Sequence, residues 1–224
     1  MYQLKVSDLQ SRTWRRIGRT VLLHGQPGAG KGIQSRLLEE RGWKWLAIGA
    51  TLRENIVAGT RIGRACEPAV AAGRLPDPKL VHDLARAAVR STPPAVDLVI
   101  DGFPRLGRQI GELDAMLRPM GRAVDLAIAL DVPCWELSRR LSSRRVCPIC
   151  HESGFPNEIL CRRDGAELVR RSDDTEEARR RRLAESTLEP IYAEYAKRGV
   201  LVRIAADKPV PMVQAAVNAG LDQA

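Results

Sequence analysis

The chain has 224 residues, a formal net charge of +9, 44% hydrophobic residues and 28% charged residues, a composition typical of a soluble globular domain. No apolar run approaches the roughly 20 residues that cross a bilayer, and the polar residues 1–18, interpreted as an N-terminal extension, lack the apolar core of a secretory signal. Five cysteines, three of them clustered, do not form a disulfide pattern. These features exclude a membrane-spanning protein and a disulfide scaffold, and they predict a cytoplasmic protein.

Short apolar runs alternate with helical patterns along the chain. Strands are expected at residues 20–24, 98–100, 126–130 and 200–204, with a shorter candidate at 44–46. Helices are expected over residues 33–41, 78–90, 107–117, 134–142, 175–197 and 210–221. This alternation predicts an α/β fold with a parallel sheet flanked by helices on both faces, and ligands beyond the carboxyl ends of the strands.

A glycine-rich segment follows the first expected strand and precedes the first expected helix: Gly25-Gln26-Pro27-Gly28-Ala29-Gly30-Lys31-Gly32. Glycines let the backbone curl so that several N–H groups point at a phosphate, at the positive end of the following helix. Lys31 then supplies a positive charge for the β- and γ-phosphates. The segment therefore predicts a phosphate-binding loop (P-loop) for a nucleoside triphosphate.

Three cysteines and an aspartate have the spacing of a metal site. Cys147 and Cys150 form one Cys-x₂-Cys pair, and Cys161 and Asp164 follow after ten residues as Cys-x₂-Asp. Zinc takes four such ligands in a tetrahedron, and a carboxylate can replace the fourth thiolate. His151 or a water molecule is the alternative fourth ligand, and the contrasting interpretation of the whole cluster is a loop of reduced cysteines. We expect a structural Zn²⁺ held by Cys147, Cys150, Cys161 and Asp164.

Four segments together resemble the adenylate kinase family of nucleoside monophosphate kinases, in its zinc-lid form. The P-loop has Gly32 where a generic P-loop has Ser or Thr, and the other segments are Asp101-Gly102-Phe103-Pro104-Arg105, Asp131-Val132-Pro133 with the arginines up to Arg145, and Arg171-Ser172-Asp173-Asp174 with Arg182-Leu183. Their order and spacing hold from about residue 20 to the end. The resemblance implies a P-loop core at residues 19–46, 77–142 and 175–224, a monophosphate-binding arm at 47–76 and a zinc-binding lid at 143–174.

The resemblance also implies the activity and the residues that carry it. It implies phosphoryl transfer from ATP, bound with Mg²⁺, to a nucleoside monophosphate, with AMP as the expected acceptor. The residues expected to bind ATP are Gly28, Ala29, Gly30, Lys31, Gly32, Ile33, Arg140, Arg144 and Lys208. Those expected to bind the acceptor are Ile48, Arg53, Arg74, Leu75, Pro76, Gly102, Phe103, Pro104, Arg105, Gln109, Arg171 and Arg182. The expected catalytic set is Lys31, Asp101, Arg105, Arg140, Arg144, Arg171 and Arg182.

Several positions depart from the family pattern. Ile33, Ile48 and Ala50 stand where Thr, Thr and Asp are usual, and Ser153-Gly154 stands where an aromatic residue usually covers the ATP base. Two alternatives follow, namely a related kinase for a non-AMP phosphorylated acceptor and a non-catalytic relative that binds nucleotides or nucleic acid. The complete set of arginines favours catalysis over binding alone. We expect a monomer whose partners are small nucleotides, without membrane or nucleic-acid binding.

Overall fold

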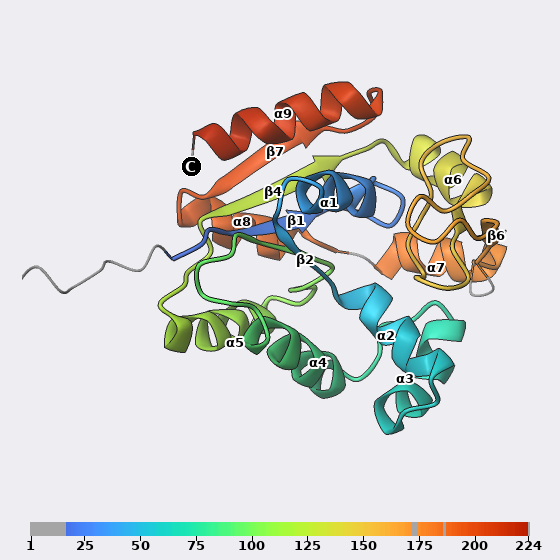
Figure 1. The fold of residues 1–224 in the computed structure, drawn as a ribbon, viewed down its shortest axis with the longest axis horizontal. Helices are drawn as coiled ribbons and strands as arrows, with labels where there is room; N and C mark the ends of the chain where they lie inside the picture. The colour runs from blue at the N-terminus through green and yellow to red at the C-terminus, as the bar shows by residue number, and fades with distance from the viewer. Residues whose placement is uncertain (1–16, 172–173, 186, 224) are drawn as a thin grey trace, which may run out of the picture.

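Five parallel strands form the centre of the structure (Figure 1). The structure is a computed structural model, which describes residues 17–171, 174–185 and 187–223. The predicted N-terminal extension lies outside the described residues except for Ile17 and Gly18, as do Ser172 and Asp173 of the predicted lid. The strand order is β2-β3-β1-β4-β7. In chain order these strands are β1 (Thr20–His24), β2 (Lys44–Ala47), β3 (Leu98–Asp101), β4 (Leu126–Asp131) and β7 (Leu201–Ala205).

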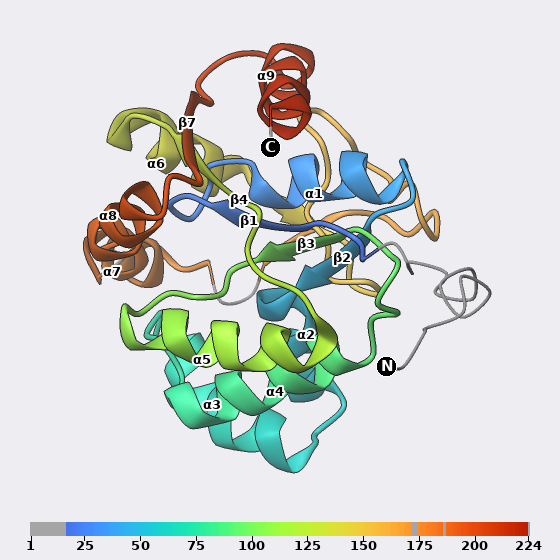
Figure 2. The ribbon, with the colours of Figure 1, turned by 90° about the vertical axis from the view of Figure 1, so that its left-hand side faces the viewer.

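Helices cover both faces of this sheet (Figure 2). Successive strand residues point to opposite faces, so Leu22 packs into one buried cluster and Leu23 into the other. The Leu22 face is covered by α4 (Pro78–Arg90), α5 (Arg108–Leu117) and α8 (Glu189–Lys197). The Leu23 face is covered by α1 (Lys31–Glu39) and α9 (Val210–Asp222). A short helix, η2 (Arg118–Met120), follows α5 in the chain. The continuous apolar strands thus form because both faces are buried, as predicted.

Two excursions leave the core between these elements. The first contains α2 (Ile48–Val57) and α3 (Arg61–Ala71), whose side chains Leu52 and Cys66 pack with Leu84 of α4 in a small separate cluster. The second runs from α6 (Cys134–Ser143) through the antiparallel pair β5 (Arg145–Val146) and β6 (Val169–Arg170) to α7 (Glu176–Glu185). The first excursion corresponds to the predicted arm, and the second contains the predicted lid. The division of the chain into core, arm and lid domains remains a prediction.

The predicted helix over residues 175–197 is wrong as a single element. It is interrupted, because α7 ends at Glu185 and α8 begins at Glu189 after the N-cap residue Leu188. Pro190 lies in the first turn of α8, where its missing N–H and fixed φ are tolerated, whereas inside a helix they would remove a hydrogen bond. No helix in the described part of the chain is long and apolar enough to span a membrane.

Candidate active site

A cleft of about 1150 Å³ opens beyond the carboxyl ends of the strands and is bordered by both excursions. Residues 28–33 of the P-loop line it. The other predicted site residues that line it are Ile48, Arg53, Arg74, Leu75, Pro76, Asp101, Gly102, Arg105, Gln109, Arg140, Arg144, Arg171, Arg182 and Lys208. Phe103 and Pro104 do not lie on the cleft wall, because both are buried and Phe103 packs in the core beneath it. The structure therefore brings nearly all the predicted residues into one cavity.

The P-loop joins β1 to α1 through left-handed glycines. Gly28 and Gly30 have φ of 88° and 95°, a region that side-chain-bearing residues rarely adopt. Lys31 begins α1, and its Nζ donates hydrogen bonds to the carbonyl oxygens of Gly25 at 2.9 Å and Gln26 at 3.1 Å. Burial lowers the pKa of Lys31 to about 8. The ammonium group is thus held on its own loop, at a helix N-terminus suited to an anion.

Asp101 and Arg105 lie beside the P-loop because β3 is the neighbour of β1, with Leu23 opposite Asp101. Burial raises the pKa of the Asp101 carboxyl, and the charges of Lys31 and Arg105 oppose that rise. Gln109 lines the same part of the cleft. Its Oε1 accepts hydrogen bonds from the backbone N–H groups of Arg105 at 2.8 Å and Leu106 at 3.1 Å. This bonding fixes the loop that carries Arg105.

Asp174 gathers arginines from three segments. Arg144, which follows α6, donates to its two carboxylate oxygens at 2.8 and 2.6 Å, and Arg182 of α7 also donates to it. Arg171 Nε lies 3.9 Å from the same carboxylate. Burial and the neighbouring charge of Arg171 lower the pKa of Arg144 to about 10. Asp174 belongs to a predicted motif without a predicted role, and the structure shows that it holds the arginine cluster together.

A buried ion pair joins the second excursion to α1. Glu152 accepts from Arg36 at 2.9 Å and from Arg163 at 2.6 Å, and Arg36 also donates to the carbonyl oxygen of Ser153 at 2.8 Å. Phe155 lines the cleft, and the guanidinium group of Arg36 lies 5.4 Å from the centre of the Phe155 ring. Phe155 directly follows Ser153-Gly154 and so provides an aromatic ring that the sequence motif does not predict at this position.

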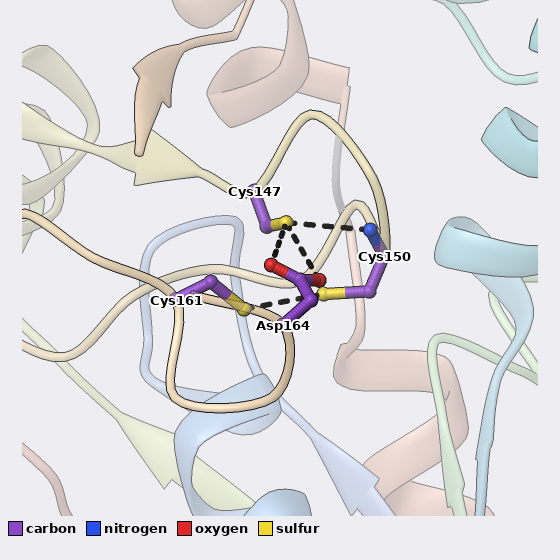
Figure 3. A group of neighbouring side chains, drawn as sticks. All are labelled: Cys147, Cys150, Cys161 and Asp164. Atoms are coloured by element: carbon purple, nitrogen blue, oxygen red, sulfur yellow. Dashed lines mark hydrogen bonds between the residues drawn. The ribbon is translucent and has the colours of Figure 1, made fainter. Parts of the chain in front are cut away.

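The four predicted metal ligands come together within the second excursion (Figure 3). Their ligand atoms all lie within 4.8 Å of one another, with 3.7 Å between the sulfurs of Cys150 and Cys161 and 3.1 Å from Cys147 Sγ to an Asp164 oxygen. A tetrahedral zinc–thiolate site requires sulfurs about 3.8 Å apart, given Zn–S bonds of about 2.3 Å. His151, with φ of 58°, is not in the cluster. The donor set could hold a metal ion, and Asp164 lies where a fourth ligand is needed.

Comparison with known proteins agrees with this geometry. A family model described as adenylate kinase matches residues 23–200. The chain is 37% identical to an adenylate kinase of Thermodesulfovibrio yellowstonii over 186 residues, which cover 79% of this chain and 86% of the relative. It is 36% identical to an adenylate kinase of Pyrococcus furiosus over 82% of this chain and 87% of the relative, and 34% identical to one of Novosphingobium aromaticivorans over 89% and 97%. The chain therefore belongs to the adenylate kinase family of nucleoside monophosphate kinases.

Proposed function

We propose that the chain transfers the γ-phosphoryl group of ATP, bound with Mg²⁺, to AMP and so forms two molecules of ADP. The observation that carries this proposal is the cleft itself, which is lined by a P-loop with Lys31 and, from the neighbouring strand onward, by Arg105 and Gln109. Arg144 and Arg182, both bonded to Asp174, also line it. Two phosphate-bearing ligands and a set of cations to neutralise them fit this arrangement.

The proposed reaction needs positioning and charge rather than a general base. A phosphate monoester has a second pKa of about 6, so the acceptor is already a nucleophilic dianion at neutral pH. His24 lies at the end of β1, but burial and the charge of Lys31 lower its pKa to about 3, so at neutral pH it is an uncharged and very weak base. Preorganised cations that offset repulsion between the two phosphates then supply most of the rate enhancement.

Six residues of the cleft have proposed roles in that step. Lys31 bridges the ATP phosphates, Arg53 and Arg105 hold the acceptor phosphate, and Arg171 and Arg182 flank the phosphoryl group in transfer. Asp101 orients water around the Mg²⁺ of the substrate complex, and the metal ion, when bound, neutralises charge on the phosphates. Planar guanidinium groups suit these contacts because they bind phosphate oxygens in pairs.

Gln109 supports AMP as the acceptor. Its Oε1 is already bonded to two backbone N–H groups, so its amide NH₂ is the group left for a ligand in the cleft. An NH₂ donor complements the acceptor nitrogens on the edge of adenine.

The second candidate is a related kinase whose phosphorylated acceptor is not AMP. Ile48 and Ala50 favour it, because both line the cleft as buried apolar side chains with 3% and 9% exposure. A coupled assay of ADP release over a panel of monophosphates separates the candidates. Turnover that is fastest with AMP supports the first proposal, faster turnover with another acceptor supports the second, and no turnover with any acceptor contradicts both.

The polarity of positions 48 and 50 provides a direct test of the acceptor. If these positions only weaken AMP binding, the double change Ile48→Thr and Ala50→Asp restores polar contacts and raises kcat/KM for AMP. Contacts of roughly 1–3 kcal/mol correspond to about 5- to 150-fold. We expect such a rise, measured by steady-state kinetics, and no change in the control Val57→Thr, whose side chain is 72% exposed on the same helix. Lower activity on another acceptor with no gain for AMP would contradict the first candidate.

We also propose that Cys147, Cys150, Cys161 and Asp164 hold a structural Zn²⁺. When bound, the ion stabilises a segment whose own buried cluster is small. Cys147→Ser, or a chelator, is expected to lower the melting temperature by about 5–10 °C, on the scale of about 2–4 °C per kcal/mol for a domain of this size. Cys134→Ser is the matched control, because Cys134 is exposed and outside the cluster. Purified protein without zinc by metal analysis would contradict the proposal.

A further inference from the structure

Glu136 is a buried carboxylate in the cleft that the proposed transfer step does not use. It lies in the first turn of α6 and lines the cleft with 6% of its side chain exposed. Hydrogen bonds from Arg139 and Arg140, opposed by burial, lower the pKa of Glu136 to about 2, so the carboxylate is charged at neutral pH. A buried charge of this kind requires partners that hold it in one geometry.

The two arginine partners of Glu136 differ in their surroundings. Arg139 binds both carboxylate oxygens, at 2.6 and 2.7 Å, and its side chain is 67% exposed. Arg140 is largely buried, and its Nε donates to Glu136 Oε1 at 2.7 Å. Both arginines line the cleft, and the carboxylate, held by the more exposed Arg139, in turn fixes the more buried Arg140.

Arg140 has a second anchor on another element. Its Nη2 donates to the carbonyl oxygen of Ala206 at 2.9 Å, and Ala206 directly follows β7. A guanidinium group is planar and delocalised, so hydrogen bonds from two of its nitrogens define the plane of the whole group. Glu136 and Ala206 together thus determine how the face of Arg140 is turned in the cleft.

The surroundings of Arg140 match a flat, partly apolar ring. The cleft wall next to Ala206 continues through Asp207, Lys208, Pro209 and Val210, of which the last two are apolar. A guanidinium face stacks favourably on an aromatic ring. A ring stacked on this face would lie beside the cleft-lining residues 206–210, because Arg140 is bonded to Ala206.

We infer that Glu136 is a positioning residue for the base of the donor nucleotide, because it sets the plane of Arg140 against which that base stacks. The inference rests on the proposed function, since it takes the donor to be a nucleoside triphosphate. A purely structural Glu136, which as an acid in the first turn of α6 stabilises the helix dipole, would change the melting temperature and leave nucleotide affinity unchanged.

Titration calorimetry of the full chain with ATP, without acceptor, tests the inference. Glu136→Leu is expected to raise the Kd for ATP about tenfold, the order expected when a charge-assisted hydrogen bond that orients a binding group is lost. Glu136→Gln keeps one acceptor oxygen and is expected to show a smaller rise. Inorganic tripolyphosphate, which has no base, is expected to bind all three proteins equally. In steady-state kinetics, KM for ATP rises while kcat and KM for the acceptor stay within twofold of the original protein.

Two further variants make the result decisive. Glu194→Leu is the matched control and is expected to leave the Kd unchanged. It removes a glutamate of α8 that pairs with Arg198, four residues later at the end of that helix, and neither residue lines the cleft. Arg140→Leu is expected to weaken ATP binding as much as Glu136→Leu, and the double variant adds nothing, because both changes remove the same oriented group.

The possible failures are distinguishable. If the original protein binds ATP and turns over but the Glu136 variants keep the same Kd, the inference is overturned and the proposed function stands. Equal weakening of tripolyphosphate binding also overturns it, since Glu136 would then act on the phosphates. If the original protein neither binds ATP nor releases ADP, the proposed function and this inference fall together.

Discussion

Replacement of Lys31 by methionine is expected to lower phosphoryl transfer by about 10²–10³-fold, the usual loss when one preorganised cation or donor is removed from a charged transition state. Nζ of Lys31 lies on the P-loop carbonyl oxygens of Gly25 and Gln26, at the start of α1. Methionine keeps most of the side-chain volume, so the packing of the loop is retained. The melting temperature is expected to stay the same or rise, because burial disfavours the charged amine, whose pKa is lowered to about 8.

The control for this prediction is Lys79→Met, which removes an exposed lysine from α4. A Lys31→Met protein that keeps more than about a tenth of the activity would contradict the assignment of the P-loop. The pH dependence gives an independent readout. The amine is charged below its pKa and neutral above it, so the affinity of the free enzyme for ATP is expected to fall as the pH rises through 8. That loss is absent in Lys31→Met.

Asp174→Asn is expected to reduce kcat by about 100-fold, the scale associated with a 1 Å misplacement of catalytic groups. The carboxylate, 6% exposed, binds Arg144 through two hydrogen bonds and Arg182 through another. Asparagine has the same shape but no charge and one acceptor oxygen in place of two. The arginines then repel one another without compensation and move apart, so the cations no longer meet the transferring group together.

Stability should change as well. Loss of one partner from a buried charge pair costs about 3–5 kcal/mol, so the melting temperature of Asp174→Asn falls, which thermal denaturation measures. Glu176→Gln is the matched control, because Glu176 pairs with Arg180 on the surface of α7, and exposed pairs contribute little. A kcat for Asp174→Asn within twofold of the original would show that Asp174 does not organise the catalytic arginines.

Three parts of the site depend on short stretches of sequence and could be predicted from the sequence alone. The P-loop is specified by a buried strand, left-handed glycines and the following helix, which all lie within one short segment. Asp101 and Arg105 follow a second buried strand, and parallel strands place such residues at a common edge. The metal cluster was predictable because Cys-x₂-Cys and Cys-x₂-Asp are turns with a fixed separation between ligands.

The contacts that could not be predicted join segments distant in the sequence. Glu152 pairs with Arg36 only because the second excursion folds back on α1, and no local pattern specifies that approach. Phe103, in contrast, was predicted to bind the acceptor and does not line the cleft. It belongs to the same motif as Asp101 and Arg105, yet its side chain turns into the core while theirs line the cleft. A motif indicates which residues are close in the chain, whereas the backbone path decides which of them reach the ligand.

The separate packing of α2 and α3 has a consequence for how the acceptor preference of this protein can diverge. Their cluster of Leu52, Cys66 and Leu84 is distinct from the two large clusters on the faces of the sheet. Ala50 lines the cleft from the helix that this small cluster supports, whereas Ile48, at the start of the same helix, packs in the large cluster that also contains Leu22 of β1. Substitutions at Ala50 and at other cleft positions of α2 outside the sheet clusters can therefore vary the acceptor while the donor side keeps its geometry, which makes α2 and α3 a suitable target for laboratory evolution.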